Sequence, residues 1–261
     1  MSDIGRSIDT ELRNIEADHA VTVLYAVESG SRAWGFESPD SDYDVRFVYQ
    51  HSTAQYVRLD DTRDVIECML EPPVGSTDVL DISGWDLSKT LRLLHDSNPV
   101  IFEWDKSPIN YRTSQQWLAI RAVLPSYFSQ KKALHHYLSM ASRNIRSYLS
   151  GETVRLKKYF YVLRPLLAAL WVLHHSSPPP MIFTELMDAE LPAALRSSVT
   201  ELLAAKAVTS EMGEGPHIAM IDRYIAQAVD DLKLEASAIS PQSTPGWANL
   251  NDLFRRLVLP T

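Results

Sequence analysis

The chain has 261 residues, 45% of them hydrophobic and 22% charged, and its 33 acidic and 25 basic side chains give a formal net charge of -8. That composition predicts a soluble globular protein long enough for two domains. The single cysteine, Cys68, excludes an internal disulfide, and the lack of a Cys/His cluster argues against a thiolate zinc site. The polar N-terminus and the absence of an apolar run of roughly 18 residues predict a cytoplasmic protein without membrane association.

The charge is unevenly distributed along the chain. Residues 131–164 carry eight basic side chains and a single acidic one, whereas the segments before and after them are acidic. The negative total argues against nucleic-acid binding through a global positive field, yet it allows a local basic face. A basic run of this kind is equally typical of a solvated helix face, so both interpretations stay open.

The first half of the chain is predicted to be mixed α and β. Helical spacing predicts an amphipathic helix before the first strand, from the apolar residues Ile4, Ile8, Leu12 and Ile15. Runs of β-branched, aromatic or alternating residues predict five strands, at 21–27, 43–49, 55–59, 65–71 and 79–83. On the second of these strands Asp44, Arg46 and Val48 share one face. Asp86 is predicted to cap the helix that follows the last strand.

The second half is predicted to be helical. Helical periodicity predicts helices within 126–151, 153–175, 192–207 and 218–237. The stretch 176–180, SSPPP, cannot continue a helix and is predicted to be a loop. We therefore expect two domains, an α/β domain over residues 1–112 and a helical domain over residues 113–261.

The most informative segment is the run Asp42-Tyr43-Asp44, at the start of the second strand. Two carboxylates at positions i and i+2 of a strand project from the same face, so both reach one point in space. Side-by-side negative charges are costly unless cations neutralise them. Oxygen-only ligands of this kind suit Mg²⁺ or Mn²⁺ bound together with substrate phosphates.

A glycine-serine turn precedes that strand. Gly30-Ser31 supplies backbone N–H groups and a hydroxyl, and a glycine lets a phosphate approach the backbone closely. Arg32 stands beside the turn, where a guanidinium is able to clamp a phosphate oxygen. A helix that begins after Gly30 would add its positive end to the anion site. The turn and the acidic strand together predict a site for metal-bound phosphates.

The segment from Gly30 to Tyr49, GSRAWGFESPDSDYDVRFVY, resembles the signature of the polymerase-β nucleotidyltransferase superfamily, a glycine-serine turn followed about ten residues later by a D-x-D strand. It looks most like the RlaP-like branch, bacterial predicted nucleotidyltransferases linked to RNA repair, and residues 79–104 resemble that branch as well. The resemblance is strong over residues 24–105. It implies an α+β fold, in which a nucleotidyltransferase-type mixed sheet with flanking helices precedes an all-helical C-terminal domain.

The resemblance implies a third carboxylate on a neighbouring strand. Asp81 is the first choice, because it lies in the strand-like run VLDIS ahead of a glycine and a helix. The alternatives are Asp78, Asp86, Glu67 and Glu71. The resemblance therefore implies that Asp42, Asp44 and Asp81 are the catalytic and metal-binding residues.

The resemblance also implies a chemistry, nucleotide transfer from a nucleoside triphosphate, ATP among them, with two metal ions, Mg²⁺ or Mn²⁺. One ion, held by the three carboxylates, would activate an acceptor hydroxyl, and the other, held by Asp42 and Asp44, would bind the triphosphate. Gly30 and Ser31 would hold the outer phosphates, with help from Arg32.

The basic segment has a place in the same scheme. Lys158 and Arg164 fall where the helical domain of such enzymes faces the cleft, so they are candidate contacts for the triphosphate or for an acceptor backbone. Tyr159 and Tyr161 alternate with them. These tyrosines are more typical of a helix-bundle core than of residues that stack on a base.

Three functions are compatible with these features. The first is transfer of a nucleotide to an RNA end, which the resemblance favours. The second is nucleotidylation, such as AMPylation, of a protein or a small molecule. The third is an inactive fold that serves as a binding or regulatory module, which clustered, mutually repelling carboxylates argue against. The sequence contains neither GxSxG nor GxxxxGK[ST], so a serine hydrolase and a P-loop enzyme are not expected.

Overall fold

The computed structural model describes residues 3–60, 62–70, 79–209, 213–240 and 243–259. The chain forms two compact units: the first comprises residues 1–33, 41–127 and 244–261, and the second residues 34–40 and 128–243. Neither unit is one continuous stretch, unlike the expected ranges 1–112 and 113–261. The reason is that a short loop of the first half packs among the later helices, while the last helix packs in the first unit.

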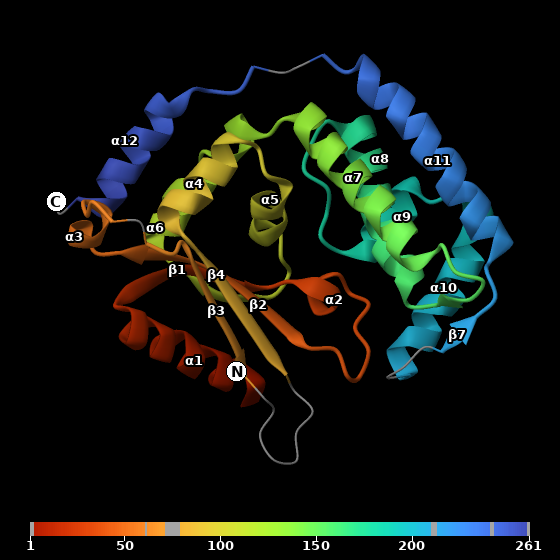
Figure 1. Cartoon of the computed structure of the whole chain (residues 1–261), viewed down its shortest axis with the longest axis horizontal. Coiled ribbons are helices and arrows are strands. Elements are labelled where there is room, and N and C mark those ends of the chain that lie inside the picture. The colour runs from red at the N-terminus through yellow and green to blue at the C-terminus, as the bar shows by residue number, and fades with distance from the viewer. Residues whose placement is uncertain (1–2, 61, 71–78, 210–212, 241–242, 260–261) are drawn as a thin grey trace. The chain divides into compact units, whose positions relative to one another are not determined.

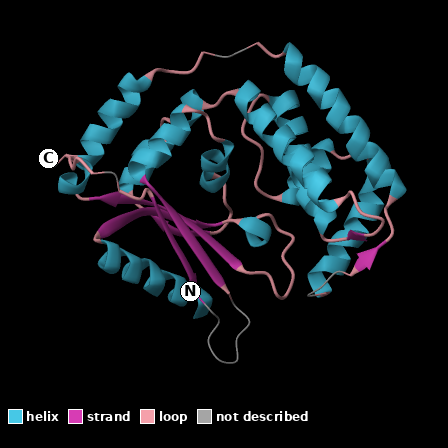
Figure 2. Cartoon of the chain, viewed as in Figure 1, coloured by secondary structure: helices cyan, strands magenta, loops and turns pink. Residues whose placement is uncertain are grey.

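The first unit is built on a five-stranded mixed sheet (Figure 2). Its strands are β1 (Val21–Glu28), β2 (Tyr43–His51), β3 (Val65–Leu70), β4 (Leu80–Asp86) and β5 (Asn110–Thr113). They are ordered β3-β4-β2-β1-β5, with β2 and β4 parallel and the other neighbours antiparallel. The strands predicted at 21–27, 43–49, 65–71 and 79–83 are confirmed over their described residues.

The strand predicted at 55–59 is wrong. The segment begins in a short helix, α3 (Thr53–Tyr56), and continues without regular structure. Val57 and Leu59 are exposed, so these apolar side chains do not face a core. Alternation in a sequence produces a strand only where one face of that strand has a core to cover.

Helices cover both faces of the sheet (Figure 1). Besides α3, the α-helices of the first unit are α1 (Asp3–His19), α2 (Gly30–Ala33), α4 (Leu87–His95), α5 (Pro99–Asp105), α6 (Gln115–Arg121) and α12 (Trp247–Val258). The predicted N-terminal helix is confirmed, because Ile8 and Leu12 of α1 are buried in one cluster with Phe47 of β2. The predicted cap of α4 is confirmed as well, since the Asp86 carboxylate accepts the Ser88 N–H at 2.7 Å.

Helix α12 returns the end of the chain to the first unit. It packs against α4 and α6. The Gln50 side-chain amide donates a 3.0 Å hydrogen bond to the carbonyl of Leu257, and the Thr53 hydroxyl donates to the carbonyl of Val258. Residues 244–261 therefore belong to the first unit, which contains the sheet, although the sequence predicted them in the helical domain.

The second unit is a helix bundle. Its elements are α7 (Gln130–Tyr148), β6 (Val154–Arg155), α8 (Lys158–His175), α9 (Phe183–Glu190), α10 (Ala193–Val208), β7 (Glu214–Gly215) and α11 (Ala219–Ala238). The predicted helices are confirmed, and α9 and the two-residue strands β6 and β7 are additional. Residues 34–40 join the bundle because the Phe36 ring packs on those of Phe160 and Phe183, at centroid distances of 5.2 and 5.5 Å.

Helix α8 is the centre of this bundle. Residues around its whole circumference are buried, including Leu163, Leu166 and Leu167. A helix that is apolar all round needs partners on all sides, which α7, α9 and α11 provide. Among the residues that the structure describes, no helix has the length and apolarity required to cross a bilayer.

Candidate active site

Strands β2 and β4 bring two acidic side chains together. In their parallel register Asp44 lies opposite Asp81. Residues opposite each other on adjacent strands point to the same face, so the two carboxylates converge. The structure thus places the preferred third carboxylate beside Asp44, on a strand that begins well after β2 in sequence.

The other candidates for a third carboxylate are accounted for differently. Glu67 pairs with Arg63 on the exposed side of β3. Asp86 caps α4. The remaining two, Asp78 and Glu71, lie outside the described residues. Of the described candidates, Asp81 is the one that meets Asp44.

Arg46 links the two acids. Its Nη2 atom donates to Asp44 Oδ1 at 2.9 Å and to Asp81 Oδ2 at 2.8 Å. Its Nη1 atom donates to the backbone carbonyls of Val45 at 3.1 Å and Asp81 at 2.9 Å. Sequence reasoning placed Arg46 on the face of Asp44 but assigned it no role. The signal was present in the D-x-R spacing, which puts both side chains on one side of a strand.

The Gly30 turn lies directly against the Asp44 side chain. Gly30 has a φ of +60°, and a Cβ atom built on it would lie 1.8 Å from Asp44 Oδ2. The Ser29 N–H also donates to the Asp44 carbonyl at 2.8 Å. Only glycine fits this position, because both its left-handed backbone and the close approach exclude a side chain. Ser31 follows in α2, a helix of only 4 residues, so the predicted helix dipole here is small.

Arg32 holds the loop that leads into β2. Its Nε and Nη2 atoms donate to the carbonyl of Ser41, at 3.2 and 2.6 Å, and Nε also donates to the carbonyl of Asp42 at 3.1 Å. Its guanidinium lies 3.7 Å from the centre of the Tyr43 ring. These contacts position the start of the acidic strand, and the predicted phosphate clamp stays a prediction. The side chain of Asp42 itself is exposed.

A buried glutamate supports the acidic strand from behind. Glu28, at the end of β1, has no exposed surface. One of its oxygens accepts the Asp44 N–H at 2.7 Å, and the other accepts the Tyr111 hydroxyl. Burial raises the pKa of Glu28 to about 7, although both hydrogen bonds oppose that rise. Sequence reasoning missed this residue, whose signal is a carboxylate at the end of an otherwise apolar strand.

The acids of the site offer the donor type that a hard divalent cation prefers. Burial raises the pKa of Asp44, the Arg46 guanidinium opposes this rise, and the Asp81 and Asp42 carboxylates add to it. The donors are carboxylate oxygens, the ligands that Mg²⁺ and Mn²⁺ prefer. The described residues contain no group of three or more His, Cys, Asp or Glu side chains arranged to hold one ion. Arg46 already supplies a positive charge between two of the three acids.

Lys158 of the second unit is held by aromatic rings. Its Nζ atom lies 4.3 Å from the centre of the Tyr148 ring and 4.7 Å from that of Tyr161. Burial lowers the pKa of Lys158, and the positive charges of Lys157 and Arg155 lower it further. Cations in this situation gain from an anionic ligand, because the ring faces only partly replace lost hydration.

Arg164 is buried within the second unit. Its guanidinium lies 4.4 Å from the centre of the Trp34 ring, and Nη2 contacts the sulfur of Met181 at 3.7 Å. The expectation that Tyr159 belongs to the core is confirmed, since its ring is fully buried and its hydroxyl donates to Asp222 at 2.9 Å. Arg164 thus orders Trp34, a residue of the signature segment.

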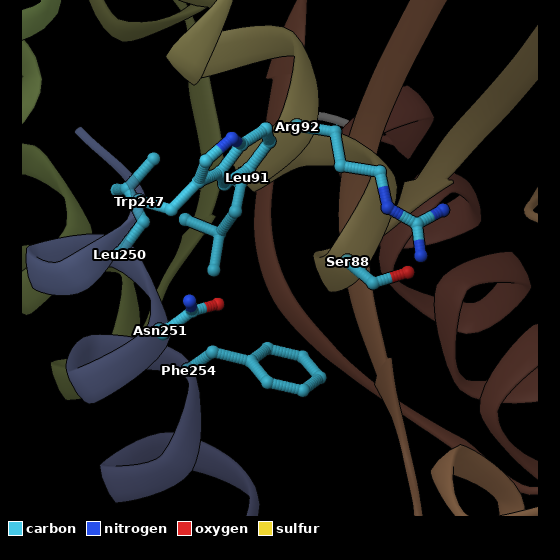
Figure 3. A pocket seen from close by; sticks show the side chains of 7 residues that line it. All are labelled: Ser88, Leu91, Arg92, Trp247, Leu250, Asn251 and Phe254. Atoms are coloured by element: carbon cyan, nitrogen blue, oxygen red, sulfur yellow. The ribbon is translucent and has the colours of Figure 1, made fainter.

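A small pocket of about 120 Å³ lies between α4 and α12 in the first unit (Figure 3). Arg92 of α4 and Trp247, Asn251 and Phe254 of α12 contribute side chains to it. The His95 ring stacks on Trp247 at 3.7 Å. The pocket is lined without a carboxylate and is adjacent to the end of β4 opposite Asp81, so it is separate from the acidic site.

The mixed sheet, the glycine turn and the Asp44–Asp81 pairing of β2 and β4 are features that the nucleotidyltransferase signature in the sequence implies. Residues 4–256 match the sequence profile of RlaP, described as the RNA repair pathway DNA polymerase beta family. The match covers nearly the whole chain, and the chain belongs to this family.

Two further proteins are similar to the chain. A relative from Bacillus subtilis (strain 168), named uncharacterized protein YcgL, is 42% identical over 259 residues, which cover 97% of this chain and 95% of the relative. A solved structure of a nucleotidyltransferase-like protein from Exiguobacterium sibiricum 255-15 covers 88% of this chain and 75% of its own, with 13% identity and a TM-score of 0.33.

Proposed function

We propose that the protein transfers a nucleoside monophosphate from a nucleoside triphosphate to a hydroxyl of an RNA end. The observation that carries the proposal is the convergence of Asp44 and Asp81 beside the Gly30 turn. Membership of a nucleotidyltransferase family supports the reaction type. In this reaction the acceptor oxygen forms a bond to the α-phosphorus while the bond to the leaving oxygen breaks, and pyrophosphate departs with the hydroxyl proton released to solvent.

Each residue of the site has a place in that reaction. Asp42, Asp44 and Asp81 supply the negative charge that holds divalent cations, of which the superfamily signature implies two. Mg²⁺ or Mn²⁺, when bound, would neutralise the triphosphate and lower the pKa of the acceptor hydroxyl. Gly30 lets the Asp44 carboxylate approach its backbone closely. The backbone N–H groups of the Gly30 turn and the Ser31 hydroxyl are the proposed contacts of the outer phosphates. The residues act by orientation and charge stabilisation, which supply most of the acceleration in phosphoryl-group chemistry.

The second unit carries a candidate phosphate contact of its own. Lys158 is proposed to bind a phosphate, either of a triphosphate or of an acceptor backbone, and its position on two tyrosine rings and its lowered pKa support this. Arg164 and Arg32 complete the set of candidate phosphate contacts. Because Arg164 is buried against Trp34 and Arg32 is bonded to the loop at Ser41, both would act mainly by fixing these neighbours.

RNA is the preferred acceptor for two reasons. The family description names an RNA repair pathway. The basic segment 131–164 offers the local positive charge that a polynucleotide backbone requires. A protein or small-molecule acceptor, and an inactive binding module, are the competing outcomes of the test.

The test is a labelling experiment with the purified full chain. The protein is incubated with each of the four α-labelled nucleoside triphosphates, with Mg²⁺ or Mn²⁺, and with separate pools of RNA, protein and metabolites. The proposal predicts label on RNA that depends on the metal. Label on protein or metabolites would contradict the RNA acceptor, and no label in any pool would contradict the enzyme.

A further inference from the structure

Arg46 differs from the surface arginines of the first unit. Arg58 and Arg63 are more than half exposed, and each pairs with a single acid. Arg46 is 21% exposed and makes four hydrogen bonds, two to backbone carbonyls and two to carboxylates on different strands. Arg112, 22% exposed, is likewise held by two acids, Asp9 and Glu16. Arg46 differs from it because its two acids are the candidate metal ligands Asp44 and Asp81.

The two oxygens of Asp44 face different partners. Oδ1 accepts from Arg46. Oδ2 is the atom nearest to the space above Gly30, where a Cβ would lie 1.8 Å away. One oxygen of this carboxylate is therefore engaged by a cation of the protein itself, and the other lies on the side of the glycine turn.

The fixed charges of the site bear on how many cations it binds. Asp42, Asp44 and Asp81 carry three negative charges when ionised, and Arg46 returns one positive charge. A single divalent ion balances the remainder before any substrate arrives. A second divalent ion between Asp44 and Asp81 would lie next to the fixed Arg46 guanidinium, and like charges repel strongly at such short range.

We propose that Arg46 takes one of the two cation positions of the acidic site, so that the chain binds one divalent ion, through Asp42 and Asp44. Asp81 is then the partner that holds Arg46 in place. The proposal rests on the proposed function, because it concerns the same site. In this proposal the positive charge of Arg46 offsets the negative charges of Asp44 on β2 and Asp81 on β4 throughout the reaction.

The experiment counts bound ions. Mn²⁺ is titrated into the full chain with a non-hydrolysable triphosphate analogue, and free Mn²⁺ is measured by its electron paramagnetic resonance signal. Wild type is expected to bind about one Mn²⁺ per chain, and Arg46→Met about two, because the position between Asp44 and Asp81 becomes vacant. Arg58→Met, which removes an exposed arginine, is the matched control and should bind about one.

Two further variants keep the proposal falsifiable if Arg46→Met does not fold. Asp81→Asn should leave the Mn²⁺ affinity within about threefold of wild type, whereas Asp42→Asn should weaken it by about tenfold or more. Two ions on wild type, one ion on folded Arg46→Met, no binding to wild type, or equal losses in Asp81→Asn and Asp42→Asn would each overturn the proposal. The count needs no turnover, so failure of the proposed function is seen separately, as absent label transfer by wild type.

Discussion

Arg46 and Lys158, one cation from each unit, are held in different ways. In the first unit Arg46 sits between two carboxylates at hydrogen-bond distance. In the second unit Lys158 lies on two tyrosine rings, and the buried Lys206 donates to the carbonyl of Phe36 at 2.6 Å. Burial lowers the pKa of both lysines. The acidic site is thus partly neutralised from within, whereas Lys158 is held by aromatic rings and Lys206 by a backbone carbonyl.

The largest effect is expected at the acidic site. Asp44→Asn removes the charge shared by Arg46 and the bound cation, so metal-dependent label transfer should fall by on the order of 100- to 1,000-fold. The measurement is incorporation of α-labelled nucleotide by folded protein. Asp252→Asn, an exposed acid paired with Arg255, is the control and should keep full activity. Retained activity in Asp44→Asn would show that the acidic site is not needed for the reaction.

The next effect concerns the glycine turn. Gly30→Ala places a methyl group against Asp44 and should reduce label transfer by roughly 100-fold. Gly35→Ala is the matched control, because Gly35 also has positive φ, +74°, but its Cβ would meet its nearest neighbour, Ile182, only at 3.6 Å. Both variants should lose about 1–2 kcal/mol of stability from backbone strain. Equal activity losses would show that strain alone, rather than contact with Asp44, explains the need for glycine.

A smaller effect is expected in the second unit. Lys158→Ala should weaken binding of a triphosphate or of RNA by about tenfold at low salt, and the difference should shrink as salt increases. Lys233→Ala removes an exposed lysine of the same unit that is paired with Asp230, and it should change binding little. Fluorescence anisotropy with a labelled ligand measures both. Identical curves for wild type and Lys158→Ala would mean that the lysine only packs on its rings.

The smallest expected effect is on stability, and it concerns a histidine of the second unit that contacts an acid. His217 contacts an acid, through Asp222 Oδ2 at 2.8 Å, and the carbonyl of Gly151 at 2.8 Å. Its hydrogen bonds to Gly151 and Asp222 raise the pKa of His217 above 6.5. A raised folded-state pKa gives stability that is fully present below the unfolded value and is lost as pH rises through the folded one. His217→Gln should therefore lower the melting temperature at pH 5.5 and have less effect at pH 8.5.

His135→Gln, which replaces an exposed histidine of the same unit, is the control variant for that measurement. A His217→Gln deficit that is the same at both pH values would contradict the raised pKa.

The acidic strand could be predicted from sequence because its signals are local. Gly30, Asp42 and Asp44 lie within one short segment, in which Asp44 lies on β2 and Asp42 directly precedes that strand. The cap of Asp86 could be predicted for the same reason, as its partner is two residues away. Asp81 required a choice among five acids, because strand pairing over a long separation is not encoded in local periodicity.

The groups that support the site could not be predicted in this way. Glu28 meets Tyr111 only because the four-residue strand β5 pairs with β1. Arg46 acquires its role only when β4 supplies Asp81 on the neighbouring strand. The failed strand at 55–59 has the same origin, since a local pattern does not reveal whether a core lies beneath it. Long-range contacts, rather than propensities, determine these residues' roles.

The most direct measurement compares two labels on the same nucleoside triphosphate. The protein is given its acceptor pool and metal, with label on either the α- or the γ-phosphate, and the products are separated. Nucleotidyl transfer predicts that α-label appears on the acceptor while γ-label is released as pyrophosphate, in equal amounts. Label from the γ-phosphate on the acceptor, or α-label found only as free monophosphate, would contradict the assignment of this site as a nucleotidyltransferase.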